Sequence, residues 1–181
     1  MSGTMSDTVA SLVRRAVHAR RENRLGDAQR DLIEAVALGR QARALRELVQ
    51  ALKGLGEIER DLGRGAAARP LYEEAVDLSR EGGDPLVLAH TVRHLGDIHQ
   101  DAGRLELAEA CYLEALALYR GHEGTPPLDL ANAVRPLAIL REHRGQAEEA
   151  RRLWTEARDL YASVDVREGV KECADRLDRL D

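Results

Sequence analysis

Small and large apolar residues recur along the chain at spacings typical of helices. In the stretch LAEACYLEALAL, Ala108, Tyr112 and Ala115 are separated by four and then three residues, which places them on one helix face. Gly103 precedes this stretch, and glycine readily adopts the left-handed conformation that ends a helix and turns the chain. The pattern predicts a helix, a turn at Gly103, and a second helix whose Ala–Tyr–Ala face packs against the adjacent hairpin.

The same pattern occurs three times, in segments that begin at Leu55, Leu95 and Leu137 and align without gaps at shifts of 40 and 42 residues. Each segment has an early small residue, then a glycine, an alanine, an aromatic residue and a second alanine. These positions are Gly56, Gly63, Ala68, Tyr72 and Ala75; Gly96, Gly103, Ala108, Tyr112 and Ala115; and Ala138, Gly145, Ala150, Trp154 and Ala157. Because a single hairpin cannot bury its apolar face alone, hairpins of this kind are expected to stack into a solenoid.

This frame resembles the tetratricopeptide repeat, whose usual period is about 34 residues. The additional residues lie between frames, in SREGGDPLVLAHTV and YRGHEGTPPLDLANAV, and the segments ARPLYEEAVDL and LANAVRPLAIL resemble the long variant found in kinesin light chains. The resemblance covers residues 40–162. It implies an all-α fold, a right-handed superhelical solenoid of stacked antiparallel helix hairpins.

We interpret residues 1–181 as one such domain of nine helices, with four hairpins and a C-terminal capping helix. The parts are a degenerate first repeat at 6–39, repeats at 40–83, 84–124 and 125–164, and a capping helix at 165–181. Helix starts are predicted at Asp84-Pro85 and Thr125-Pro126, where an N-cap precedes a proline. Pro70 and Pro136 fall inside predicted helices, where we expect kinks or late starts and not breaks.

Composition supports a helical chain and narrows the functional classes. Hydrophobic residues make up 44% of the 181 residues, yet there is no Phe, one Trp and four Tyr, so Leu and Ala dominate the core. The net charge of −5 argues against general nucleic-acid binding. Without a long apolar run or a signal peptide, no membrane partner is expected and the protein is predicted to be soluble and cytoplasmic. Cys111 and Cys173 lack metal-site spacing and are interpreted as reduced core residues.

No catalytic motif occurs in the sequence, so we predict neither an enzyme nor a bound cofactor. The one cluster that suggests chemistry is HTVRHLGDIH, where His90, His94 and Asp97 are spaced by four and then three residues. That spacing could place three metal ligands on one helix face. We favour the alternative that these are polar residues of a groove, with His99 packed at a site where the resembled family often has Tyr, and we predict no metal site.

In the resembled family, the first helix of each hairpin lines a concave groove that holds an extended partner segment. The corresponding positions here are Gln50, Lys53, Glu57 and Arg60; His90, Arg93, Asp97 and Gln100; and Asn132, Arg135, Ile139 and Glu142. One column is basic throughout, at Lys53, Arg93 and Arg135, and is expected to be exposed. It is either a solvated face balanced by the neighbouring acidic residues Glu57, Asp97 and Glu142, or a site for carboxylates, which guanidinium groups bind as a fork.

The function implied is that of an adaptor that binds an extended segment of another protein, acidic or carboxylate-ended, in this groove. The Lys and Asn set with which some related domains grip C-terminal carboxylates is not reproduced, so that activity is not inferred. The alternative is a structural protein that assembles with itself through the ends or the convex face of the solenoid.

Overall fold

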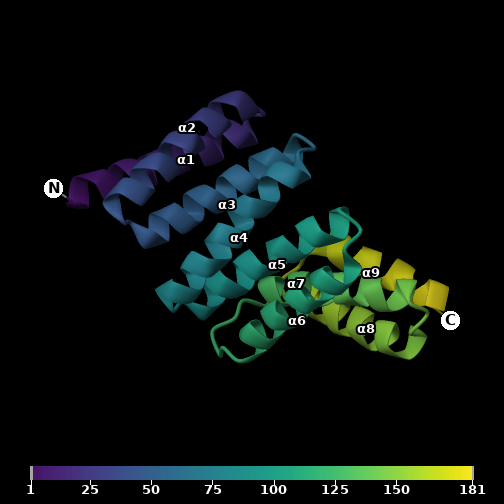
Figure 1. The fold of residues 1–181 in the computed structure, drawn as a ribbon. Helices are drawn as coiled ribbons and strands as arrows, with labels where there is room; N and C mark the ends of the chain where they lie inside the picture. The colour runs from purple at the N-terminus through teal and green to yellow at the C-terminus, as the bar shows by residue number, and fades with distance from the viewer. Residues whose placement is uncertain (1, 181) are drawn as a thin grey trace. The chain divides into compact units, whose positions relative to one another are not determined.

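A computed structural model describes the backbone of residues 2–180 and the side chains of residues 5–180. Within this range the chain forms nine α-helices and no strand, which confirms the all-α repeat architecture (Figure 1). The helices are α1 (Ser2–Arg21), α2 (Leu25–Ala42), α3 (Leu45–Asp61), α4 (Gly65–Gly82), α5 (Pro85–Asp101), α6 (Leu105–Arg120), α7 (Pro127–His143), α8 (Ala147–Ser163) and α9 (Arg167–Leu180). The predicted domain begins at residue 1, and its capping helix ends at residue 181. Both of these residues lie outside the described part of the chain.

The chain divides into two compact units, Met1–Asp84 and Pro85–Asp181. The first unit contains the hairpins α1–α2 and α3–α4, and the second contains α5–α6, α7–α8 and the single helix α9. Each unit has its own buried apolar cluster, one running from Val9 to Ala75 and the other from Ala89 to Cys173. The single domain inferred from the sequence therefore stays a prediction.

The glycines of the repeat make the turns that the sequence predicts. Gly63, Gly103 and Gly145 have φ angles of 73°, 70° and 71°, in the left-handed region that favours glycine. Between α1 and α2, where the sequence has no such glycine, Asn23 takes this role with φ 58°. Asparagine is among the few residues that tolerate this conformation, so the degenerate first hairpin keeps the same turn geometry.

The face of alanine and aromatic residues is buried, as expected. Ala108, Tyr112 and Ala115 are all within 1% of complete burial, and a Cβ added at Gly96 would lie 2.6 Å from a Tyr112 ring carbon. A Cβ added at Gly56 would likewise lie 2.6 Å from a ring carbon of Tyr72. The ring of the second helix thus packs against the first helix of its own hairpin, whereas the sequence pattern placed this seam against the adjacent hairpin.

The prolines define helix boundaries with one correction. Helix α5 begins at Pro85 as predicted, but α7 begins at Pro127, with Pro126 as an extended N-cap at φ −61° and ψ 136°. The shift of one residue has a steric reason, because a residue that precedes proline is pushed out of the helical region. Pro70 and Pro136 both lie inside continuous helices, so neither breaks its helix.

Arg–Glu pairs join consecutive second helices within each unit. Arg40 in the last turn of α2 contacts Glu74 of α4 at 2.5 Å and 3.1 Å, and Arg120 at the end of α6 contacts both carboxylate oxygens of Glu156 in α8 at 2.7 Å and 2.8 Å. The two pairs occupy corresponding places in the repeat. Such exposed pairs add little to stability, at most about 1 kcal/mol each.

No helix in the described part of the chain is both long enough and apolar enough to cross a membrane.

Candidate protein-binding face

The twelve groove positions predicted from the sequence all lie on first helices, but they fall in two units. Gln50, Lys53, Glu57 and Arg60 lie on α3 of the first unit; the remaining eight lie on α5 and α7 of the second. Of the twelve, Gln50 is exposed, Lys53 is buried, and the other ten are partly buried. The predicted basic column is therefore not the freely solvated row that the sequence suggested.

In the first unit, the α3 positions are engaged by neighbouring side chains. Lys53 is only 7% exposed, which corrects the expectation that it stands free in solvent. Arg20 of α1 forms an ion pair with Glu57 and donates a second hydrogen bond to Asp61 at 2.7 Å. The hydrogen bond to Asp61 raises the pKa of Arg20, although partial burial opposes this effect. Helix α1 thus holds Glu57 and Asp61 of α3 in place.

In the second unit, Arg93 lies at the centre of a polar cluster on α5. Its guanidinium group donates to Asp97 Oδ2 at 3.3 Å and lies 2.8 Å from His94 Nε2. Only 15% of the Arg93 side chain is exposed, so the expectation that Arg93 is exposed is wrong. Asp97 lies one turn further along α5 and contacts Arg93 on the same helix face, and the adjacent His94 also contacts its guanidinium group.

Asp97 remains charged within this cluster. Burial alone would raise its pKa, but the hydrogen bond with His94 and the charge of Arg93 outweigh burial and lower the pKa below its usual value. The Tyr112 hydroxyl lies 3.0 Å from Asp97 Oδ1 and 2.9 Å from Gln100 Oε1, two acceptors for its single proton. Burial, followed by the Asp97 charge, raises the pKa of Tyr112, so its hydroxyl stays a donor.

On α7, as on α5, buried aromatic residues of the second helix hold polar residues of the first helix by hydrogen bonds. Trp154 Nε1 donates to Glu142 Oε2 at 3.1 Å, and the Tyr161 hydroxyl donates to Asn132 Oδ1 at 2.8 Å. Both rings are at least 96% buried. Four of the predicted positions, Asp97, Gln100, Asn132 and Glu142, are therefore held from beneath by groups that belong to the hairpin core.

Helix α9 supplies partners for two of the predicted α7 positions, Arg135 and Glu142. The sequence analysis did not identify these partners. Arg135 Nε and Nη2 each donate to the Glu172 carboxylate at 2.8 Å, and this hydrogen bonding raises the pKa of Arg135. Arg176 donates to Glu142 at 3.1 Å, and its guanidinium carbon lies 5.5 Å from the Trp154 ring centre. The Arg135 partner lies 37 residues away in the sequence, and no local spacing points to it.

Arg93 of α5 and Arg135 of α7 both lie close enough to the Tyr161 hydroxyl of α8 to affect its ionisation. Burial raises the pKa of the Tyr161 hydroxyl, while the charges of Arg135 and Arg93 both lower it. Two guanidinium groups from different helices thus act on one hydroxyl. We call the eight α5 and α7 positions the polar face; they are His90, Arg93, Asp97, Gln100, Asn132, Arg135, Ile139 and Glu142.

The geometry does not favour the metal alternative for His90, His94 and Asp97. The two imidazole rings lie 4.5 Å apart, while His94 and Asp97 are both engaged with Arg93. Among residues 5–180, no group of three or more His, Cys, Asp or Glu side chains is placed to hold a metal ion. His90 and Asp97 are better described as members of the polar face, and His94 as a neighbour that contacts Arg93 and Asp97.

Comparison with known proteins agrees with this architecture. The family model described as "Tetratricopeptide repeat" matches residues 47–121, which run from α3 through α6. The crystal structure of BtubC (BKLC) from P. vanneervenii is similar, with a TM-score of 0.61 and 19% sequence identity over 99% of this chain and 89% of that chain. At this identity the likeness is one of fold. No curated protein sequence matches the chain significantly.

Proposed function

We propose that this chain, whose residues 47–121 match the tetratricopeptide repeat, acts as an adaptor that binds an extended segment of a partner on its polar face, because such repeats are generally protein–protein interaction modules. The supporting observation is the fixed position of the polar side chains. Tyr112, Trp154 and Tyr161 hold them by hydrogen bonds from the hairpin cores. A surface ordered before binding loses less conformational entropy when a partner docks.

The partner segment in this proposal carries carboxylates. Arg135 already binds the carboxylate of Glu172 through two parallel hydrogen bonds, which illustrates the recognition that a guanidinium group offers. Arg93 lies on the same face with the imidazole rings of His90 and His94 close by. Binding that depends on these groups should weaken as salt rises, because salt screens partly exposed charges.

Partner capture from an extract of the source cells tests the proposal. The wild-type chain and two single variants are immobilised at equal density, and the principal captured protein is quantified at low and moderate salt. Arg93→Gln alters the polar face, whereas Arg120→Gln removes a charge from the end of α6, where Arg120 pairs with Glu156. We expect Arg93→Gln to reduce capture at least tenfold, about 1.4 kcal/mol, and Arg120→Gln to leave it nearly unchanged.

Equal capture by both variants would contradict the proposal. Circular dichroism establishes that each variant is folded, and Gln100→Ala provides a second probe of the same face if Arg93→Gln is unstable. Light scattering over a range of concentrations tests the alternative of self-assembly. A constant monomeric mass supports the adaptor, whereas a mass that rises with concentration, together with no captured partner, favours a self-assembling structural protein.

A further inference from the structure

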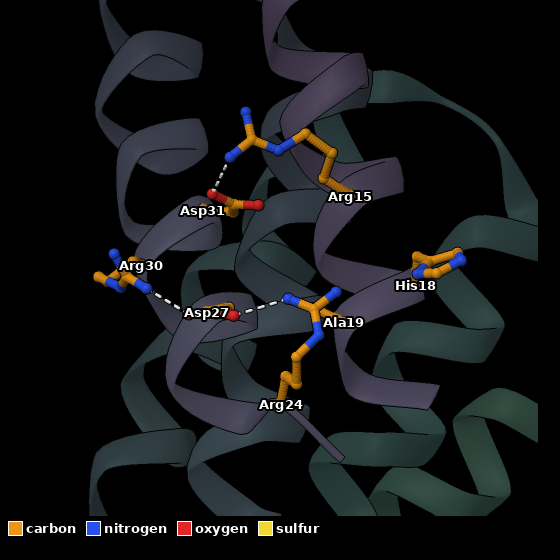
Figure 2. A pocket seen from close by; sticks show the side chains of 7 residues that line it. All are labelled: Arg15, His18, Ala19, Arg24, Asp27, Arg30 and Asp31. Carbon is orange, nitrogen blue, oxygen red and sulfur yellow. Dashed lines mark hydrogen bonds and ion pairs between the residues drawn. The ribbon is translucent and has the colours of Figure 1, made fainter. Parts of the chain in front are cut away.

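The first hairpin contains a hollow that the polar face does not include. The hollow lies between α1 and α2, has a volume of about 350 Å³, and is open to solvent (Figure 2). It is lined by Arg15, His18, Ala19, Arg24, Asp27, Arg30 and Asp31. This volume lies at the lower end of the range found for small-molecule sites.

Two aspartates of α2 hold the three arginines that line the hollow. Arg15 Nη2 donates to Asp31 Oδ1 at 2.6 Å, Arg24 Nη1 donates to Asp27 Oδ2 at 2.6 Å, and Arg30 pairs with the other oxygen of Asp27. Figure 2 shows Arg24 rising from the turn between the helices toward Asp27, with Arg15 reaching Asp31 further along the hairpin. The aspartates restrict the arginine side chains, which lowers the entropy cost of binding a further group.

These pairs leave hydrogen-bonding capacity for a ligand. A guanidinium group has five N–H donors. Asp31 accepts from a single nitrogen of Arg15, and Asp27 accepts from a single nitrogen of Arg30. Three arginines and two aspartates give the lining of the hollow an excess of positive charge. Glu22 accepts hydrogen bonds from Nε and Nη2 of Arg24 and also lies 3.4 Å from His18 Nδ1, so it offsets part of the positive charge at this edge of the hollow.

The surroundings of the hollow also favour an anion. Residues 2–42, which form the α1–α2 hairpin, contain seven arginines and five acidic residues, although the whole chain has a net charge of −5. The first turn of α2 borders the hollow, and a Cβ at Gly26 would meet nothing within 4 Å, so this helix end is open. The N-terminus of a helix carries partial positive charge and attracts phosphate groups.

We propose that the hollow between α1 and α2 binds a phosphoryl group, with Arg15, Arg24 and Arg30 as its ligands. Arginine suits this role because its planar fork matches phosphate oxygens, and each of the three retains donors beyond its aspartate. The volume accommodates a phosphate monoester with a small organic part as well as free phosphate. The site is independent of the polar face, which lies in the second unit.

Titration calorimetry of the full chain in a phosphate-free buffer tests the site with O-phosphoserine, inorganic phosphate and serine as probes. We expect saturable binding of at least one phosphorylated probe and none of serine. Tighter binding of O-phosphoserine identifies a monoester as the ligand, and equal or tighter binding of phosphate identifies the free ion. Arg24→Gln should weaken binding at least tenfold, and Arg15→Gln is a second variant should Arg24→Gln fail to fold.

The matched control is Arg21→Gln, which removes the same charge from the end of α1 but not from the lining of the hollow. We expect it to change affinity less than twofold. Equal losses in Arg24→Gln and Arg21→Gln would show only general attraction to a basic hairpin and would overturn the proposal. Absence of saturable binding of both phosphorylated probes at millimolar concentration would overturn it as well.

Discussion

At the scale of single residues, the contact between Gly96 and Tyr112 determines how closely the helices of a hairpin approach. A methyl group at Gly96 would lie 2.6 Å from the buried ring, which can move little because its hydroxyl contacts Asp97 and Gln100. We expect Gly96→Ala to lower the free energy of unfolding by about 1–3 kcal/mol, as other overpacked cores do. Urea denaturation followed by circular dichroism measures this change.

Gly26 is the matched control for this substitution. It lies in a helix, but a Cβ there would meet nothing within 4 Å. Gly26→Ala should therefore leave stability unchanged or raise it by up to about 1 kcal/mol, because alanine favours the helix. A Gly96→Ala variant as stable as Gly26→Ala would contradict the packing described for the hairpin.

The two cysteines should differ in reactivity. Cys173 is completely buried, and burial raises the pKa of its thiol to about 11, whereas Cys111 is partly exposed. Alkylation at pH 8, followed by mass spectrometry, should modify Cys111 first and Cys173 only after unfolding. Equal labelling rates in the native state would contradict the burial of Cys173.

The raised pKa of the Cys173 thiol also implies that the stability of the protein declines as pH rises from about 9 to 11, because the thiol of the unfolded chain then releases its proton more readily than the buried one.

Sequence spacing was sufficient for core residues but not for polar ones. The Ala–aromatic–Ala face is set by helical periodicity, so its burial could be predicted from intervals of four and three residues. The limited exposure of Arg93 and Arg135 could not be predicted in this way, because it depends on the side chains that contact them. Asp97 and His94 lie on the helix of Arg93, but Glu172 reaches Arg135 from another helix. Solvent exposure of a charged residue follows from such contacts and not from its own type.

At the scale of helices, α9 completes the second unit. Its Cys173 is buried, and a Cβ at Gly169 would lie 2.6 Å from the Tyr161 ring, so α9 packs closely on α8. Removal of residues 165–181 should lower the melting temperature substantially, because it exposes the apolar end of the repeat array. Glu172→Gln, which removes only the partly exposed ion pair with Arg135, should cost no more than about 1 kcal/mol. Equal melting of the truncated and full-length chains would contradict this role.

Most helix boundaries that a glycine or proline marks followed from the sequence. The three glycine turns and the start of α5 at Pro85 are confirmed. Two boundaries show where single-residue rules were insufficient. The double proline Pro126-Pro127 moved the start of α7 by one residue, and Asn23 made a turn that no glycine announced.

At the scale of the whole molecule, each unit buries its own apolar core. The cluster from Ala89 to Cys173 draws all of its buried residues from the second unit. Residues 85–181 produced alone should therefore fold into a helical protein with a cooperative thermal transition. Circular dichroism measures both properties. A fragment that is unfolded, or that melts without cooperativity, would show that the second core depends on residues 1–84.

The central claim is that a preorganised polar face on α5 and α7 binds the partner. The most direct measurement is the affinity of the captured partner segment for the wild type, Arg93→Gln, Tyr112→Phe and Arg120→Gln, each verified as folded. We expect at least a tenfold loss for Arg93→Gln and a smaller, measurable loss for Tyr112→Phe, which removes only the hydroxyl beside Asp97 and Gln100. Arg120→Gln should bind like the wild type. Unchanged affinity in both Arg93→Gln and Tyr112→Phe would contradict the claim.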